Sequence, residues 1–274
     1  MKRVALALGA GGARGLAHIA VFEALDELGV RPVAIAGSSI GALAGAVYGS
    51  GMSGAEIRRF ATGLARNRAE VFRRTMLSRA GSVGDVLSGA LSAVVQLDPE
   101  KLVAQFLRAP VPDDFAALKI PLTVVASDLY ARRTVTFESG PLRPPLAASI
   151  AIPGLMRPVV VGGRVLIDGG CTNPLPFELL RAKADVIVAV DITGQPVEDR
   201  RDVPSPVETL YSAVQLMTSS IIAGQLRHEG PDILVRPDIG AFRALDFFQA
   251  NAILGATEAA KAEFKSQLRA VLGI

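Results

Sequence analysis

Gly37-Ser38-Ser39-Ile40-Gly41 places a serine between two glycines, directly after the apolar run Val33-Ala34-Ile35-Ala36. A G-x-S-x-G stretch in this setting is typical of a nucleophile elbow, a sharp turn from strand to helix that exposes one hydroxyl. Gly37 and Gly41 remove the side chains that would clash at such a turn. Ser39 is therefore the candidate nucleophile. The same glycines would also suit a turn that only packs a helix tightly on a sheet.

Apolar runs that read as strands alternate with helical patterns along the chain. They predict strands at Val4–Leu8, Val33–Ala36, Leu122–Ser127, Thr134–Phe137, Arg164–Ile167 and Val186–Asp191. Helices are predicted over Leu16–Leu28, Ser53–Arg66, Asp98–Arg108, Val207–Arg227 and Asp246–Leu272. Ser53 followed by Glu56 has the spacing of a capping box, which marks a helix start. This alternation indicates an α/β fold built in layers.

The chain has 274 residues, of which 50% are hydrophobic, so it can bury a large core. Residues 1–274 are most simply one domain. Residues 70–97 show no strand pattern and contain three glycines, which predicts a cap or lid over a site or an ordinary insertion. The single cysteine, Cys171, cannot form an internal disulfide, and this fits a reducing compartment. The apolar run Val4–Leu8 is too short for a signal peptide, so we expect a cytoplasmic protein.

Charge is distributed unevenly along the chain. The net charge of +3 is too small to indicate nucleic-acid binding. The stretch from Arg58 to Arg79 nevertheless holds seven basic residues and one acid, with apolar residues between them. We interpret this stretch either as a solvated face or as a peripheral contact with an anionic membrane. The arginines proposed for that contact are Arg58, Arg59, Arg73 and Arg74.

A serine nucleophile needs a base to accept its proton, and three residues are candidates. His18 lies inside a predicted helix, and His228 ends another; His228 is kept as the second choice because its late position suits a Ser-Asp-His order. Asp168 is the better candidate, because it ends a predicted strand and precedes Gly169 and Gly170. An aspartate is a weak base unless burial raises its pKa. Asp-Gly is also a common hairpin turn.

The stretch Gly9-Ala10-Gly11-Gly12-Ala13-Arg14-Gly15 forms a glycine-rich turn between the first predicted strand and a helix. Backbone N–H groups at such a helix start bind anions. A dinucleotide site would need glycine at position 10 or 14, where the chain has Ala10 and Arg14, and no P-loop lysine follows. Beside a serine elbow, the same N–H groups suit an oxyanion hole.

Taken together, these motifs resemble those of the bacterial patatin-like phospholipases. The glycine loop, the elbow, Leu146–Gly154, Asp168-Gly169-Gly170 and Asn173–Pro176 match that family in order and spacing. The resemblance implies a three-layer α/β fold with a central, mostly parallel sheet flanked by helices. It also implies a Ser39–Asp168 dyad, with an oxyanion hole of backbone N–H groups at Gly11, Gly12 and Ala13 and with Arg14 fixing that loop. Ala10 departs from the family pattern, which usually has a third consecutive glycine there.

The expected function is therefore hydrolysis of lipid acyl esters, of the phospholipase A, lysophospholipase or carboxylesterase type. The resemblance implies no metal and no cofactor, and the substrate would be a phospholipid or another fatty acyl ester. We expect a cytoplasmic protein that is able to associate with the inner membrane surface. The alternative is a lipid-binding or regulatory module with little turnover, for which Ala10 gives some support.

Overall fold

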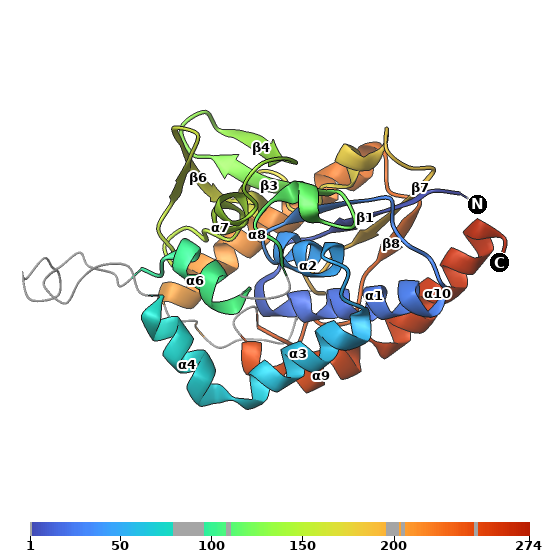
Figure 1. Ribbon diagram of the computed structural model, residues 1–274, viewed down its shortest axis with the longest axis horizontal. Coiled ribbons are helices and arrows are strands. Elements are labelled where there is room, and N and C mark those ends of the chain that lie inside the picture. Colours follow the sequence, from blue (N-terminus) through green and yellow to red (C-terminus); the bar gives the residue numbers. More distant parts are fainter. Residues whose placement is uncertain (1, 79–95, 108–110, 196–202, 204–205, 244–245) are drawn as a thin grey trace, which may run out of the picture.

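The computed structural model describes residues 2–274 except 79–95, 108–110, 196–202, 204–205 and 244–245 (Figure 1). The strands are β1 (Val4–Leu8), β2 (Ala34–Ser38), β3 (Leu122–Asp128), β4 (Arg133–Phe137), β5 (Val159–Val161), β6 (Arg164–Asp168), β7 (Val186–Val190) and β8 (Ile233–Val235). The α-helices are α1 (His18–Glu27), α2 (Ile40–Gly49), α3 (Gly54–Arg66), α4 (Arg68–Leu77), α6 (Pro99–Phe106), α7 (Arg143–Ser149), α8 (Pro206–His228), α9 (Ala250–Ala256) and α10 (Glu258–Leu272). Short 3-10 helices are η1 (Gly12–Ala17), η2 (Phe115–Ala117), η3 (Gly169–Cys171), η4 (Phe177–Leu180) and η5 (Phe247–Gln249).

The strands form one sheet in the order β5-β6-β3-β2-β1-β7-β8, with β4 also paired to β3. β3, β2, β1, β7 and β8 run parallel to one another. β4 and β6 pair with β3 in antiparallel fashion, and β5 pairs with β6 in the same way. This mostly parallel sheet with helices on both sides confirms the predicted fold class. All six predicted strands are present, and β5 and β8, of three residues each, are additional.

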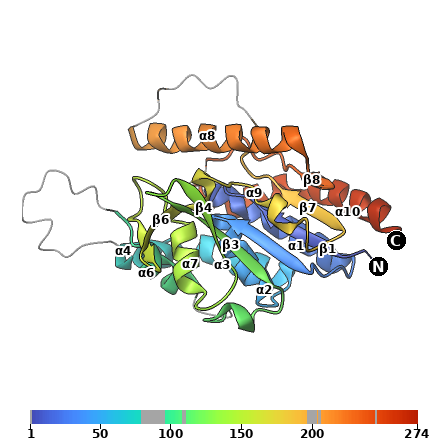
Figure 2. The ribbon, with the colours of Figure 1, turned by 90° about the horizontal axis from the view of Figure 1, so that it is seen from above.

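The two faces of the sheet carry cores of different size. Large side chains such as Leu6 and Ile35 pack with α1, α2, α7 and α10 on one face. Alanines such as Ala5 and Ala36 line the other face, where they meet η4 and α8. In Figure 2, α8 runs along one side of the sheet, and α2, α3 and α7 lie on the opposite side. The small side chains allow η4 and α8 to approach the sheet closely.

Helix ends follow local signals where the sequence supplies them. Ser53 Oγ accepts a hydrogen bond from Glu56 N–H, and the Glu56 carboxylate accepts one from Ser53 N–H, so the predicted capping box begins α3. Two predicted helices are interrupted. The first turns after the glycine loop are the 3-10 helix η1, and α1 begins only at His18. The C-terminal helix breaks at Thr257, whose N–H and Oγ1 both bind Leu254 O.

Residues 70–97, predicted as a cap or lid, are described only in part. Residues 70–77 belong to α4, which follows α3 directly. Ser78 and Leu97 are described on either side of a gap, and Asp98 N–H donates to Ser78 O at 2.6 Å. Residues 79–95 lie outside the described part of the chain, so the cap at 70–97 stays a prediction.

Candidate active site

Ser39 occupies a strained turn between β2 and α2. Its φ of 55° lies in the left-handed region, which is unusual for a residue with a side chain. The two neighbouring glycines make the turn possible. A Cβ at Gly37 would lie 2.6 Å from Ala42 N, and a Cβ at Gly41 would lie 2.2 Å from Leu8 O. The backbone therefore requires glycine at both positions to expose the Ser39 hydroxyl at the carboxyl end of the sheet.

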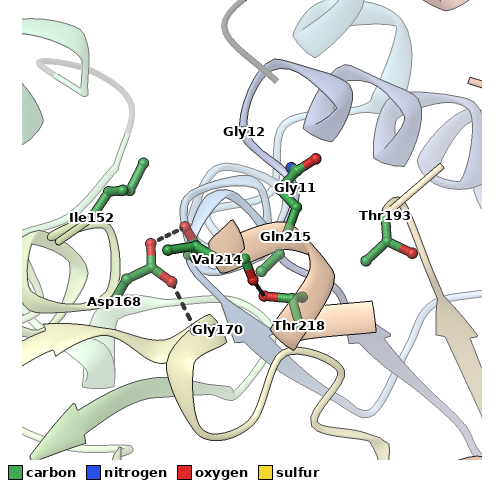
Figure 3. A pocket seen from close by; sticks show the side chains of 11 residues that line it. Gly11, Gly12, Ile152, Asp168, Gly170, Thr193, Val214, Gln215 and Thr218 are labelled. Atoms are coloured by element: carbon green, nitrogen blue, oxygen red, sulfur yellow. Dashed lines mark hydrogen bonds between the residues drawn. The ribbon is translucent and has the colours of Figure 1, made fainter. Parts of the chain in front are cut away.

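Strand β3 brings Asp168 to Ser39 although 129 positions separate them in the sequence. Ser38 at the end of β2 pairs with Val125 of β3, and Asp168 at the end of β6 pairs with Ala126. Consecutive residues of β3 thus hold the ends of a parallel and an antiparallel strand together. Ser39 Oγ donates a hydrogen bond of 2.6 Å to Asp168 Oδ2 (Figure 3). The structure therefore places the two candidate catalytic side chains in direct contact.

The Asp168 carboxyl is buried, and its hydrogen bonds leave it able to act as a base. Oδ1 accepts from Gly170 N–H at 2.7 Å, and the Asp168 carbonyl accepts from Ser127 Oγ at 2.8 Å. Burial raises the pKa of Asp168 to about 6, against the opposing effect of the hydrogen bonds from Ser39 and Gly170. At neutral pH the carboxylate is therefore mostly ionised yet more basic than an exposed aspartate.

Gly169 and Gly170 permit this close packing. A Cβ at Gly169 would lie 2.3 Å from Val125 O and 2.7 Å from Ser38 Oγ. A Cβ at Gly170 would lie 3.0 Å from the Ala10 methyl group and from Asp168 Oδ1. Asp168 thus ends a strand and caps the short helix η3, and it is not the turn residue of a hairpin.

The glycine loop follows β1, the neighbour of β2, so it meets the elbow at the same edge of the sheet. Gly11 and Gly12 line the pocket that contains Ser39 and Asp168. The first N–H groups of a helix lack acceptors within it, and η1 begins at Gly12. Among the described residues, no hydrogen bond from the N–H of Gly11 or Gly12 is found. These N–H groups can therefore bind an anionic oxygen in the pocket.

The other two residues predicted for the oxyanion loop, Ala13 and Arg14, are buried behind it. The Arg14 guanidinium donates to Gly11 O and to Thr193 O. It thereby joins the glycine loop to the segment after β7, where Thr193 also lines the pocket. This geometry suits the predicted role of Arg14 in holding the loop.

Ala10 leaves the hydrogen bonding of the loop intact. Its N–H donates to Pro174 O at 2.9 Å, so it points into the protein scaffold. Its side chain lines the pocket beside Gly170. The departure from the family pattern therefore changes the shape of the pocket wall by one methyl group.

Neither histidine lines this pocket. His18 is fully buried, and its Nε2 lies within hydrogen-bonding distance of Gly9 O, at 3.0 Å, so it contacts the start of the glycine loop. Burial lowers the pKa of His18 to about 4, which keeps the imidazole neutral. His228 is exposed at the end of α8.

Several residues in or beside the pocket were not singled out by the sequence analysis. Ser149 Oγ accepts a hydrogen bond of 2.8 Å from the Ser39 N–H and so helps to hold the strained turn. Ile152 and Thr193 line the walls, and Val214, Gln215 and Thr218 of α8 lie over the opening (Figure 3). Ser149 and Ile152 fall inside the Leu146–Gly154 motif. The three α8 residues belong to the stretch 209–226, which contains no charged residue. This lack of charge is the feature of the sequence that could have singled them out.

Two kinds of feature are absent from the described part of the chain. Within it, no group of three or more His, Cys, Asp or Glu side chains is arranged to hold a metal ion. Its helices also include none that is both long and apolar enough to cross a membrane.

Comparison with known proteins relates the chain to the patatin-like phospholipase family. Residues 6–181 match the sequence model of the family described as patatin-like phospholipase. An uncharacterised NTE family protein of Mycobacterium tuberculosis is 41% identical over 201 residues, which is 73% of this chain and 52% of that protein. Mouse patatin-like phospholipase domain-containing protein 6 is 29% identical over 199 residues, 72% of this chain and 14% of that protein. The chain spans about half the length of the mycobacterial relatives it matches.

Among solved structures, VipD from Legionella pneumophila is similar in fold. The TM-score is 0.51 at 16% sequence identity, over 96% of this chain and 67% of that protein. At this identity the likeness concerns the fold alone. The family match covers the glycine loop, Ser39 and Asp168, and it ends before α8.

Proposed function

Because the chain belongs to the patatin-like phospholipase family, we propose that it is a serine hydrolase that cleaves lipid carboxylic esters with a Ser39–Asp168 dyad. The observation that carries this proposal is the 2.6 Å hydrogen bond from Ser39 Oγ to Asp168 Oδ2 in a pocket lined by Gly11 and Gly12. The substrate class is a phospholipid, a lysophospholipid or a simpler fatty acyl ester.

In the first half of the reaction, Ser39 Oγ attacks the ester carbonyl carbon while its proton passes to Asp168 Oδ2. The carbonyl oxygen becomes an oxyanion, which the N–H groups of Gly11 and Gly12 stabilise, with Ala13 as a third candidate donor. The C–O bond to the alcohol then breaks, and the leaving oxygen takes the proton from Asp168. Ser39 is left as an acyl ester.

In the second half, water attacks the acyl carbon and gives its proton to Asp168. The same N–H groups stabilise the second oxyanion. Collapse of this intermediate releases the fatty acid, and Ser39 Oγ regains a proton from Asp168. The raised pKa of Asp168, about 6, supports its use as a base in both halves, because a base works best when its pKa is near the working pH.

Labelling with a fluorophosphonate probe, followed by peptide mass spectrometry, tests the proposal directly. We expect an adduct on Ser39 that is lost in Ser39→Ala and strongly reduced in Asp168→Asn, with both variants folded by circular dichroism. Hydrolysis of a short soluble ester should be lost in the same two variants. His228→Ala is the matched control and should label like the wild type. A folded but inactive His228→Ala would overturn the dyad, and a folded wild type that does not label would favour the lipid-binding or regulatory module.

A peripheral contact of Arg58, Arg59, Arg73 and Arg74 with an anionic membrane is a separate part of the proposal. Three of these arginines have carboxylate partners within the chain: Arg58 pairs with Glu23 and Glu258, and Arg73 and Arg74 both pair with Glu70. These pairs reduce the positive charge available to lipid. Changing all four to Gln should weaken binding to phosphatidylglycerol vesicles and leave hydrolysis of a short ester unchanged. Equal vesicle binding would identify the stretch as a solvated face.

A further inference from the structure

Helix α8 covers one side of the pocket that contains Ser39. Val214, Gln215 and Thr218 line the pocket from above, and Figure 3 shows them on the helix that lies against Asp168 and Gly170. The free space within the pocket is about 30 Å³, which is too little for a fatty acyl chain. An ester with a fatty acyl chain cannot enter this space while α8 lies in the position described. Turnover of such a substrate therefore requires α8, or part of it, to move.

The two halves of α8 are held differently. In the C-terminal half, Ile222 is buried in the smaller core with Phe177 and Leu180, and Gln225 Nε2 donates to Asn173 Oδ1 at 2.9 Å. In the N-terminal half, Leu210 lies against Gly154, where a Cβ would meet Leu210 Cδ2 at 2.5 Å. Leu210 is nevertheless 49% exposed. The C-terminal half is thus anchored in the protein, whereas Leu210 in the N-terminal half leaves about half of its side chain exposed.

The outward side of α8 carries no charge over residues 209–226 and exposes large apolar side chains among hydroxyl residues, which are Thr209, Ser212, Ser219 and Ser220. Leu216 and Met217 are 71% and 57% exposed, and with Leu210 they form what we term the outer face. Residues 209–226 contain no charged side chain, and Arg227 follows at the end of the helix. A helix on the surface of a water-soluble domain normally turns charged residues outward. Exposed leucine and methionine side chains without a neighbouring charge suit the acyl region of a lipid surface, and Arg227 at the helix end suits its phosphate level.

From these observations we propose that α8 is a lid, and that its outer face docks on the surface of aggregated lipid and thereby opens the pocket. This inference rests on the proposed lipid hydrolase function. Docking favours the open state only if the open state binds lipid more tightly than the closed state does. Opening would supply that difference, because Val214, which now lines the pocket, would join Leu210, Leu216 and Met217 in contact with lipid. The active site would then face the substrate surface.

The lid hypothesis predicts that the enzyme responds to the physical state of its substrate. A short-chain phosphatidylcholine is titrated through its critical micelle concentration, and the rate per enzyme is measured on both sides. We expect the wild-type rate to rise by at least about tenfold when micelles form. The free energy of transferring two large apolar side chains from water to hydrocarbon is larger than the free energy that corresponds to a tenfold change in an equilibrium constant. The double variant Leu216→Ser/Met217→Ser should keep the monomeric rate within about twofold and lose most of the rise. Tyr130→Ser/Val160→Ser, which removes equally exposed apolar side chains from other elements, is the matched control and should behave like the wild type.

A binding measurement separates failure of the lid from failure of the proposed function. Ser39→Ala protein, with and without Leu216→Ser/Met217→Ser, is sedimented with phosphatidylcholine vesicles and with phosphatidylcholine–phosphatidylglycerol vesicles. Binding that is at least about tenfold weaker in the outer-face variant supports the docking surface even if no ester is cleaved. Equal binding, or an active wild type without a rise at the micelle threshold, overturns the proposal. A wild-type dimer that becomes monomeric in the variant, without vesicle binding, would assign the face to a second copy of the chain and also overturn it.

Discussion

In the proposed dyad, Asp168 has to meet two requirements that oppose each other. It must be buried beside Ser39 to accept a proton, yet burial disfavours the carboxylate that accepts it. The structure balances these effects with hydrogen bonds from Ser39 and Gly170, and the resulting pKa is about 6. The sequence allowed Asp168 to be predicted as the base, because it ends an apolar strand before two glycines. Its environment was not predictable, because the burying residues come from distant parts of the chain.

The pKa of Asp168 predicts the pH dependence of hydrolysis. Below a pH of about 6 the carboxyl is protonated and cannot accept the Ser39 proton, so kcat/KM for a short soluble ester should fall about tenfold per pH unit. Above that pH the rate should reach a plateau, because no histidine lines the pocket within the described part of the chain. A half-maximal rate near pH 4, where an exposed aspartate titrates, would contradict the buried position of Asp168.

The same shift predicts that Asp168→Asn stabilises the fold while it removes activity. Because the folded-state pKa is raised above the unfolded value, the stabilising effect of the bound proton is present at low pH and is lost as pH rises through about 6. At pH 8 the neutral asparagine should therefore raise the free energy of unfolding by about 1–3 kcal/mol. Near pH 4 the two proteins should be equally stable. Urea unfolding at both pH values measures this difference. Burial lowers the pKa of His18 to about 4, and the resulting pH dependence of stability is the same in both proteins.

The elbow shows how a single element is constrained by what packs against it. Gly37 and Gly41 are required because backbone atoms of β1 and α2 occupy the space that a side chain would fill. Gly63 also lies in a helix, α3, but a Cβ added there would meet no atom of the described residues within 4 Å. The sequence pattern G-x-S-x-G singled out the first two, but their contacts depend on the approach of β1 to α2.

Matched glycine substitutions should therefore have opposite effects. Gly41→Ala should lower the free energy of unfolding by about 3 kcal/mol or more, or prevent folding, because its Cβ would lie 2.2 Å from Leu8 O. Gly63→Ala should raise it by about 0.5–1 kcal/mol, since alanine is the better helix former at an open position. Thermal and urea unfolding of both variants compare the two. A neutral Gly41→Ala would mean that β1 and α2 are farther apart than described.

At the level of the complete fold, an ion-pair network joins three helices that are distant in sequence. Glu23 of α1 pairs with Arg58 of α3 and with Lys261 of α10, and Glu27 pairs with Lys261 and Lys265. Burial raises the pKa of Glu23, but its hydrogen bonds from Arg58 and Lys261 outweigh this and lower the pKa overall. The Glu23 side chain is only 10% exposed, so its partners hold it more tightly than a surface pair would be held.

Breaking this network should destabilise the protein without affecting the site. Glu23→Gln leaves Arg58 and Lys261 without their shared carboxylate and should lower the free energy of unfolding by about 1–2 kcal/mol at pH 7. Because the pKa of Glu23 is lowered by folding, this difference should shrink as pH falls below the value of a free glutamate. Glu263→Gln is the control, because Glu263 lies on the same helix as Lys261 and its carboxylate binds only Gln267 among the described residues. This variant should change the free energy of unfolding little. Equal unfolding midpoints for both variants would contradict the role given to Glu23.

The sequence was sufficient to predict the alternating strands and to single out Ser39, the glycine loop and Asp168 as candidates, because each depends on residues that are neighbours in the chain. Local order also predicted the start of α3, through Ser53 and Glu56. The meeting of Ser39 with Asp168 depended instead on β3, which pairs with the ends of both β2 and β6. The support of Ser39 by Ser149 and the position of α8 beside the pocket likewise arise only when the sheet brings remote segments together. Such contacts leave no periodic pattern in a single sequence, since register and layer packing are set by the free energy of the complete core.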